Sequence, residues 1–226
     1  MIKAIVTDIE GTTSSLSFVK GVLFPYARTK LPEYVRQHKA EATVKQLLAD
    51  TCQEAEVDYD IESAITQLIL WIDHDKKITP LKALQGLIWE AGYKRGDFTG
   101  HLYQDAIDNL KAWKAKGISL YAYSSGSVLA QKLLFGHTDE GDLTPLFSGF
   151  FDTNIGGKKE ADSYQKIADE IGLPADNILF LSDIKEELDA AKTVGYQTIW
   201  LTRGNAPDAH AEHPQVSSFD DIEFDS

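Results

Sequence analysis

Residues 1–13, MIKAIVTDIEGTT, decide the fold of this chain. The apolar and β-branched run at residues 2–6 predicts a buried strand, which delivers Asp8 and Glu10 at its carboxyl end, directly before Gly11. Side chains two positions apart on an extended chain share a face, so the two carboxylates crowd together unless a cation or a proton compensates them. Asp and Gly also serve ordinary polar turns, and this alternative is open while the stretch is taken alone.

Composition predicts a globular protein and argues against several kinds of partner. With 226 residues, 43% of them hydrophobic, the chain can bury a full core. A formal net charge of −13 argues against nucleic acid and against an anionic membrane surface. Cys52 is the single cysteine, so no intrachain disulfide can form and a reducing compartment is expected. Because we find neither a leader segment nor a run of about 18 apolar residues, we expect a cytoplasmic protein without a membrane partner, and we further expect a monomer.

The segment after the first strand has a helical character. Between Thr13 and about residue 118 there is almost no strand signal. Apolar residues in 61–72 recur at i, i+4, i+7 and i+11, which predicts an amphipathic helix. Thr79 and Pro80 predict the N-cap and the first residue of another helix. We therefore expect an all-helical domain at residues 16–101, inserted after the first strand.

From about residue 104, helices and strands alternate. Apolar runs predict strands at residues 118–123, 149–152, 178–181 and 197–201, and helical segments between them end at glycines such as Gly172 and Gly195. Strands that alternate with helices imply right-handed crossovers. We therefore predict an α/β fold, with a doubly wound parallel-sheet core at residues 1–15 and 102–226. In such a sheet the ligand binds at the carboxyl ends of the strands.

Polar side chains follow three of the predicted strands: Asp8 with Glu10, Ser124 with Ser125, and Asp183. A serine turn or an aspartate before a helix can simply cap the helix, and Lys158 could be ordinary surface charge. Their joint order points to chemistry, because carboxylate oxygens suit Mg²⁺ while hydroxyls and a lysine suit phosphate oxygens. Together they predict a phosphoryl-transfer site.

The stretch DIEGTT, residues 8–13, resembles the first motif, Asp-x-Asp-Gly-Thr, of the haloacid dehalogenase superfamily of aspartyl phosphatases. Ser124 then corresponds to the hydroxyl of the second motif, Lys158 to the lysine of the third, and Asp183 to the start of the fourth. The fourth motif is similar in detail, since SDIKEELDAAKTVG at residues 182–195 carries Glu187 at its second acidic position. The resemblance spans the chain, implies a Rossmann-like core, and implies that the helical insert is a mobile cap.

Longer segments resemble a narrower family, the acireductone-forming enolase-phosphatases of methionine salvage. They are DIEGTTSSLSFVKGVLFPYA, YSSGSVLAQKLLFGH and GDLTPLFSGFFDT, at residues 8–27, 123–137 and 141–153. Glu10 stands where most phosphatases of the superfamily carry aspartate, as it does in the enolase-phosphatases. The resemblance implies a small phosphorylated diketone substrate, 2,3-diketo-5-methylthiopentyl 1-phosphate. This substrate would be enolised and then dephosphorylated to 1,2-dihydroxy-3-keto-5-methylthiopentene.

The resemblance also implies one Mg²⁺ per subunit and a role for each site residue. Asp8 would be the nucleophile and a metal ligand, and Asp183 a second ligand. Glu10 would be the general acid/base, and its main-chain carbonyl would also bind Mg²⁺. The phosphate and substrate oxygens would be bound by Ser124, Ser125 and Lys158, of which Lys158 also belongs to the catalytic set. Glu187 would support the site from behind.

Two alternatives stay open. A cap-bearing phosphatase for another small phosphate ester fits the short motifs equally well. A phospho-receiver or binding module also combines acidic residues, a hydroxyl and a lysine at a doubly wound sheet, although the long helical insert argues against it. Phosphate release from an added ester separates an enzyme from a receiver, and only the diketone phosphate separates the two enzymes.

Overall fold

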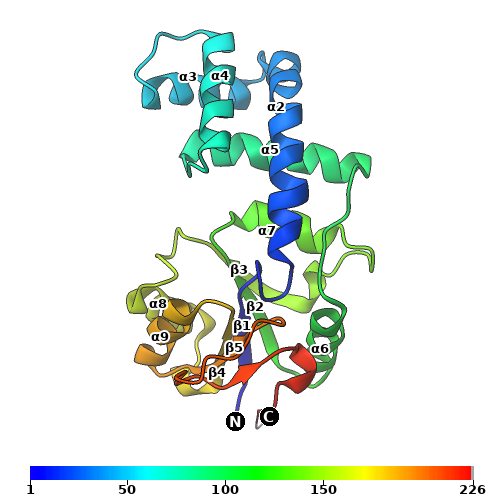
Figure 1. Cartoon of the computed structure of the whole chain (residues 1–226), viewed down its shortest axis with the longest axis vertical. Coiled ribbons are helices and arrows are strands. Elements are labelled where there is room, and N and C mark those ends of the chain that lie inside the picture. Colours follow the sequence, from blue (N-terminus) through cyan, green and yellow to red (C-terminus); the bar gives the residue numbers. More distant parts are fainter. Residues whose placement is uncertain (225–226) are drawn as a thin grey trace. The chain divides into compact units, whose positions relative to one another are not determined.

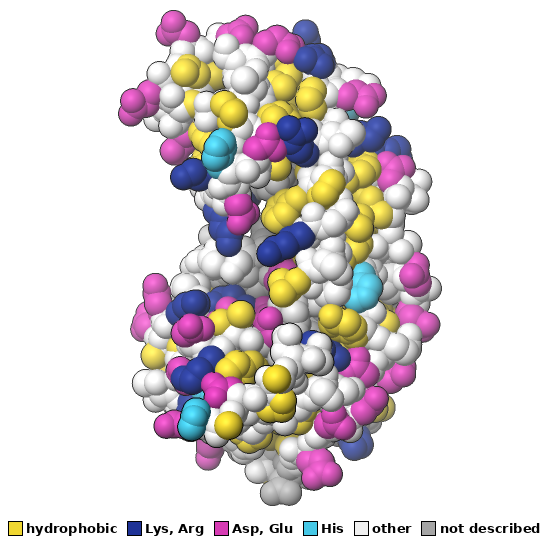
Figure 2. Space-filling model, viewed as in Figure 1, with side chains coloured by type: hydrophobic (Ala, Val, Ile, Leu, Met, Phe, Trp, Pro, Cys, Tyr) yellow, Lys and Arg dark blue, Asp and Glu magenta, His cyan; other side chains and the backbone are white. Residues whose placement is uncertain are grey.

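The computed structural model describes residues 1–224, and the chain divides into two compact units. One unit comprises Met1–Leu16 and Gly100–Ser226, and the other comprises Ser17–Thr99. The units therefore change between residues 16 and 17 and between residues 99 and 100, whereas the predicted boundaries lie between residues 15 and 16 and between residues 101 and 102. Within residues 1–224, no helix is long and apolar enough to cross a membrane. Figure 2 shows Asp and Glu side chains spread over both units with Lys and Arg between them, so this view presents no large basic face.

The first unit is built on a six-stranded sheet in the order β3-β2-β1-β4-β5-β6. The strands are β1 (Ala4–Thr7), β2 (Ser119–Tyr123), β3 (Phe147–Phe151), β4 (Ile178–Ser182), β5 (Gln197–Leu201) and β6 (Gln215–Val216). Every pairing is parallel, which confirms the predicted doubly wound sheet. Thr7 of central β1 is level with Ala122 of β2 and Leu181 of β4, so the residues that follow these three strands emerge at one edge.

Helices cover both faces of this sheet (Figure 1). They are α6 (Gln104–Ala115), α7 (Val128–Gly136), α8 (Ala161–Ile171) and α9 (Lys185–Val194), with 3₁₀ turns at Thr144–Leu146, Ala175–Asn177 and Phe219–Asp221. On the face of α8 and α9, Tyr164 and Leu188 are buried in one cluster with Val6 and Phe180 of the sheet. Figure 1 shows α6 on the opposite side from α8 and α9. This double cover explains why all four residues of β1 are buried.

The helix ends follow the glycine signals in the sequence. Gly172 ends α8 with a φ of 76°, and Gly195 ends α9 with a φ of 106°. Both values lie in the left-handed region that a residue with a Cβ adopts only at a cost.

The first strand begins two residues later than predicted, at Ala4. The two-residue strand β6 was not predicted, because so short a segment carries no period.

The second unit is all helical. It contains α1 (Leu16–Phe18, whose first residue belongs to the other unit), a π-helical turn (Val19–Leu23), α2 (Phe24–His38), α3 (Ala42–Glu54), α4 (Ile61–Asp73) and α5 (Thr79–Arg95). Its core gathers apolar residues from α2 to α5, among them Leu31, Leu48, Leu68 and Leu84, all of them fully buried. Within each helix the buried apolar residues recur at helical spacing, as Ala27, Leu31 and Val35 do in α2. This spacing explains why periodicity alone predicted a helical domain.

The start of α5 differs from the prediction by one residue. The N-cap is Ile78, in extended conformation and without a side-chain cap bond, so Thr79 is the first helical residue and Pro80 the second. The main-chain carbonyl of Ile78 accepts the first helical bond, from Lys82 N at 3.0 Å. A proline in the first turn lacks an N–H that would have no helical partner there, so both positions suit it and the sequence does not distinguish them.

Candidate active site

The loop after β1 holds Asp8 at the edge of the sheet. The Asp8 side chain is almost completely buried, and Asp8 N donates to Leu181 O at 2.8 Å, which continues the pairing with β4. The main-chain carbonyl of Ile9 then accepts three N–H bonds, from Thr12, Thr13 and Ser14, at 3.2, 3.0 and 2.8 Å. The chain therefore turns sharply directly after Asp8, and its carboxylate is fixed at the mouth of the sheet.

Lys158 reaches Asp8 from the loop before α8. Its Nζ donates to Asp8 Oδ1 and lies 2.8 Å from Glu187 Oε2. Burial alone would lower the pKa of Lys158, but the two carboxylates outweigh it and hold that pKa above its usual range. The loop itself is held by Tyr164, whose hydroxyl donates to Lys158 O at 2.7 Å. The predicted phosphate-binding lysine is therefore a buried cation that already contacts the predicted nucleophile.

Asp183 follows β4 and faces the same loop. Gly11, with a φ of +84°, lies so close that a Cβ there would stand 2.2 Å from Asp183 Oδ2. Burial and the neighbouring Asp8 raise the pKa of Asp183 to about 7. Asp183 Oδ1 is buried without a hydrogen-bond partner, while Trp200 Nε1 donates to Asp183 O at 2.9 Å. Two adjacent carboxyl groups with an unpartnered oxygen thus need either a proton or a cation.

This donor set fits magnesium better than a metal held by protein side chains alone. Within residues 1–224, no group of three or more His, Cys, Asp or Glu side chains is arranged to hold a metal ion. Mg²⁺ commonly binds through one or two carboxylates and fills its remaining positions with water and substrate phosphate. Asp8 and Asp183 supply two such carboxylates, and the unpartnered oxygen of Asp183 is a group that a cation would satisfy.

Glu10 points to Ser124 at the end of β2. Ser124 Oγ donates to Glu10 Oε2 at 3.0 Å, with Oε1 at 3.3 Å, and Gly126 N donates to Ser124 Oγ at 3.0 Å. Burial and the charge of Asp8 raise the pKa of Glu10. The Glu10 carboxylate is therefore bonded to a hydroxyl, and the metal role predicted for its main-chain carbonyl stays a prediction. Ser125 is exposed in the same turn, and its phosphate-binding role also stays a prediction.

The structure adds contacts that the sequence did not reveal. Thr12 Oγ1 donates to Asp8 Oδ2 at 3.3 Å, and Arg203 donates to the main-chain carbonyl of Thr12. Thr12 could have been found from the first motif, which contains it, whereas Arg203 lies 191 residues away and has no local signal.

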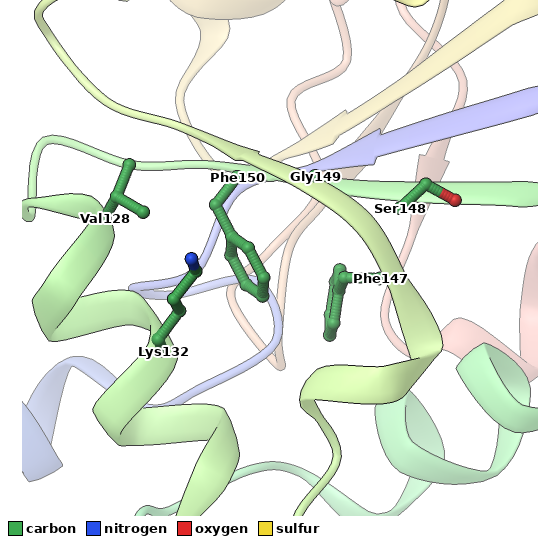
Figure 3. Close-up of a pocket in the computed structure, with 6 residues that line it drawn as sticks. All are labelled: Val128, Lys132, Phe147, Ser148, Gly149 and Phe150. Atoms are coloured by element: carbon green, nitrogen blue, oxygen red, sulfur yellow. The ribbon is translucent and has the colours of Figure 1, made fainter.

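A shallow cavity of about 280 Å³ lies elsewhere, between α7 and the edge strand β3. It is lined by Val128, Lys132, Phe147, Ser148, Gly149 and Phe150 (Figure 3). None of the predicted site residues lines it, so it is separate from the cluster around Asp8.

Comparisons with known proteins identify the family of this chain. A family model described as haloacid dehalogenase-like hydrolase matches residues 2–195. Enolase-phosphatase E1 of Methylococcus capsulatus is 60% identical over 98% of both chains, and enolase-phosphatase E1 of Thioalkalivibrio sulfidiphilus is 58% identical over 97% of this chain and 98% of its own. The crystal structure of the UTR4 protein of Saccharomyces cerevisiae is similar, with a TM-score of 0.83 and 36% identity over 98% of this chain and all of that one. The chain therefore belongs to the haloacid dehalogenase-like hydrolases and, within them, to the enolase-phosphatase E1 family.

Proposed function

We propose that this protein converts 2,3-diketo-5-methylthiopentyl 1-phosphate to its enol and then to the acireductone 1,2-dihydroxy-3-keto-5-methylthiopentene in methionine salvage. Relatives named enolase-phosphatase E1, at 54–60% identity over nearly the whole chain, support this activity. The structural observation that carries the proposal is the bond between Glu10 and Ser124 beside Asp8, because it holds a carboxyl group of raised pKa next to the proposed nucleophile.

The phosphatase step would begin at Asp8. Lys158 Nζ donates to Oδ1 of this carboxylate and Thr12 Oγ1 donates to Oδ2, so the group is oriented before substrate binds. An Asp8 oxygen would attack phosphorus to form the aspartyl-phosphate, while the bond from phosphorus to the substrate oxygen breaks and Glu10 gives that oxygen a proton. Water would then attack phosphorus, lose its proton to Glu10, and release inorganic phosphate and free Asp8.

The enolase step would use Glu10 as a base. Glu10 would take a proton from the carbon that bears the phosphate ester, where the adjacent carbonyl makes it acidic, and water would supply the proton of the enol hydroxyl that forms on the carbonyl oxygen. Glu10 would then hold the proton that it gives to the leaving oxygen in the phosphatase step. A base for such a proton works best when its pKa lies near the working pH, and burial moves the pKa of Glu10 upward, in that direction. The Ser124 hydroxyl would hold the Glu10 carboxylate before substrate binds and would donate to a phosphate oxygen instead once substrate enters.

Asp8, Asp183 and the main-chain carbonyl of Glu10 would hold one Mg²⁺ per subunit. The charge balance of the site supports this proposal. The cluster contains four carboxyl groups and one buried ammonium group, Lys158, so negative charge is in excess. The carboxyl groups are those of Asp8, Glu10, Asp183 and Glu187. When bound, the ion would neutralise the phosphate and the developing enolate. Ser124, Ser125 and Lys158 would bind the phosphate and substrate oxygens.

The remaining proposals concern the state of the protein. We propose that the protein is a monomer. The single cysteine supports a reducing, cytoplasmic location. We also propose that the helical unit, Ser17–Thr99, serves as the cap that the family resemblance implies.

One assay tests the proposed function. The diketone phosphate is supplied with and without Mg²⁺, while ultraviolet absorbance follows enolisation and phosphate release is measured in parallel. We expect both signals, and both should require the metal. Phosphate release from other esters without enolisation of the diketone would favour an ordinary phosphatase, and a stable phosphoprotein without turnover would favour a receiver.

A further inference from the structure

The segment after β5 returns to the loop that carries Asp8, and Arg203 makes the contact. Its Nε and Nη2 both donate to the main-chain carbonyl of Thr12, at 2.9 and 2.6 Å. Two N–H groups of one guanidinium on a single carbonyl fix both the position and the orientation of the peptide that follows Thr12. Arg203, which is distant in the sequence, therefore holds the loop between Gly11 and Ser14 by two hydrogen bonds.

Thr12 connects the bonds from Arg203 to the proposed nucleophile, Asp8. Its side chain is fully buried, and its Oγ1 donates to Asp8 Oδ2 at 3.3 Å. The other oxygen of Asp8 is held by Lys158. Arg203 does not touch Asp8. A movement of the Thr12 main chain would, however, displace Thr12 Oγ1, which is the donor to Asp8 that lies in the same loop.

Arg203 is itself held on several sides. Its Nη1 lies 2.5 Å from Asp105 Oδ2 on α6, an oxygen that also accepts from Ser218 Oγ at 2.8 Å and from Phe219 N at 2.7 Å. The guanidinium lies 4.2 Å from the ring centroid of Tyr103 and 4.9 Å from that of Phe219. The Arg203 side chain is 11% exposed and that of Asp105 15%. Arg203 is thus held by Asp105 and the two rings on one side, and its two bonds to Thr12 join it to the loop of Asp8 on the other.

The backbone of Arg203 carries strain as well. Its φ is 47°, and within residues 1–224 it is one of only three non-glycine residues in the left-handed region. A long side chain adopts this conformation at a cost, and such outliers persist where surrounding contacts determine them. Here those contacts are the bonds to Thr12 and Asp105.

We propose that Arg203 is a positioning residue, which orients the Asp8 carboxylate for attack by fixing the peptide of Thr12. This inference rests on the proposed role of Asp8 as nucleophile. The expected consequence is specific to the rate constant, because Arg203 is bonded to the loop of Asp8 and not to Ser124 or Lys158, the groups proposed to bind phosphate.

The test is Arg203→Lys, which keeps the positive charge but replaces the planar guanidinium, whose Nε and Nη2 both donate to Thr12 O, with a single nitrogen on a flexible side chain. The matched control is Arg36→Lys, because Arg36 also makes a two-bond contact, to Glu62 at 2.9 and 2.7 Å, exposed on the helical unit. We expect kcat for phosphate release from the diketone phosphate to fall about 10- to 100-fold in Arg203→Lys, as for a nucleophile displaced by a fraction of an ångström. KM should stay within about twofold, and the control should match wild type.

A second variant separates positioning from simple loss of stability. Arg203→Ala is assayed with and without millimolar guanidinium, well below denaturing concentrations, which should restore part of kcat by filling the vacated site. A folded Arg203→Lys protein with wild-type kcat, a change in KM alone, or an Arg203→Ala protein that guanidinium does not rescue would each overturn the inference. Asp8→Asn in the same assay tests the proposed function separately, since turnover by that variant would remove the nucleophile assignment itself.

Discussion

Glu187 Oε2 lies 2.8 Å from Lys158 Nζ, and both side chains are buried. Ser182 Oγ donates to the same carboxylate oxygen at 2.8 Å, so Glu187 is bonded on two sides. Lys158 therefore divides one positive charge between Glu187 and Asp8. Two carboxylates facing one ammonium group leave negative charge in excess around this lysine. Burial and the charge of Asp8 raise the pKa of Glu187.

The first prediction compares the two partners of this ion pair. Lys158→Met leaves Asp8 and Glu187 buried without a counter-charge, so it should lower the free energy of unfolding by about 3–5 kcal/mol in metal-free buffer at pH 8. Glu187→Gln retains an acceptor and removes one excess charge, so its Tm should stay within a few degrees of wild type. Thermal unfolding followed by circular dichroism makes the comparison. Equal losses in the two variants would mean that Lys158 is not the counter-charge.

The second prediction concerns Asp183 and the metal. Asp183→Asn removes the repulsion with Asp8, so the Tm of the metal-free protein should rise by a few degrees, since about 1 kcal/mol moves the Tm of a chain of this size by roughly 2–4 °C. Mg²⁺ should raise the Tm of wild type but not of Asp183→Asn, because binding stabilises only a protein that holds the ion. Glu186→Gln, exposed nearby on α9, is the control and should respond to Mg²⁺ as wild type does. A full Mg²⁺ response in Asp183→Asn would contradict the ligand assignment.

The third prediction concerns Glu10. Glu10→Gln removes the titrating proton, so it should slow enolisation and phosphate release together, each by roughly 10²- to 10⁴-fold. Glu10→Asp should be milder for phosphate release than for enolisation, because the shorter side chain falls short of the carbon-bound proton. Parallel ultraviolet and phosphate measurements on both variants give the answer. If Glu10→Gln enolises at the wild-type rate, another group is the base.

The fourth prediction is the pH dependence of the enolisation rate in the wild-type protein. A base works only when it is deprotonated, so the rate should fall as the pH drops through the pKa of Glu10. Burial is the largest cause that raises that pKa, and bound Mg²⁺ would offset the charge of Asp8 and not the burial, so the acid limb should lie above the ordinary range of a glutamate. A profile of kcat/KM between pH 4.5 and 8.5 measures it. An acid limb that persists unchanged in Glu10→Gln would assign the titration to another group.

The fifth prediction uses Asp105, outside the proposed site. Burial would raise its pKa, but the bonds from Phe219 N, Arg203 and Ser218 outweigh that effect and lower it. A lowered pKa means that the stabilisation is present at neutral pH and is lost as the pH falls through the folded-state pKa. Asp105→Asn should therefore cost about 1–3 kcal/mol at pH 7, as for a hydrogen-bonded charge, and progressively less toward pH 3. Urea unfolding at several pH values checks this, and a cost that does not depend on pH would refute it.

The sequence by itself determined the parallel sheet and the positions of its polar ends. Buried strands and amphipathic helices carry their periods locally, so the runs that became β1, β2 and β4 placed Asp8, Ser124 and Asp183 at one edge. Gly172 and Gly195 ended their helices as expected, because the tolerance of a positive φ is a property of glycine itself. The start of α5 was misjudged by one residue, since Pro80 suits the second helical position as well as the first.

Only the tertiary structure decided which groups meet. Strand β6 exists because Trp200 N donates to Pro214 O at 2.8 Å, a bond between backbones that no local pattern encodes. Lys158 was recognised as a candidate, but its contacts with Asp8 and Glu187 depend on how the loops after different strands are packed. Arg203 reaches Thr12 across 191 residues, and a single arginine in a sequence carries no mark of its partner. Periodicity reports the burial of a segment, whereas a contact between distant side chains depends on the packing of the whole domain.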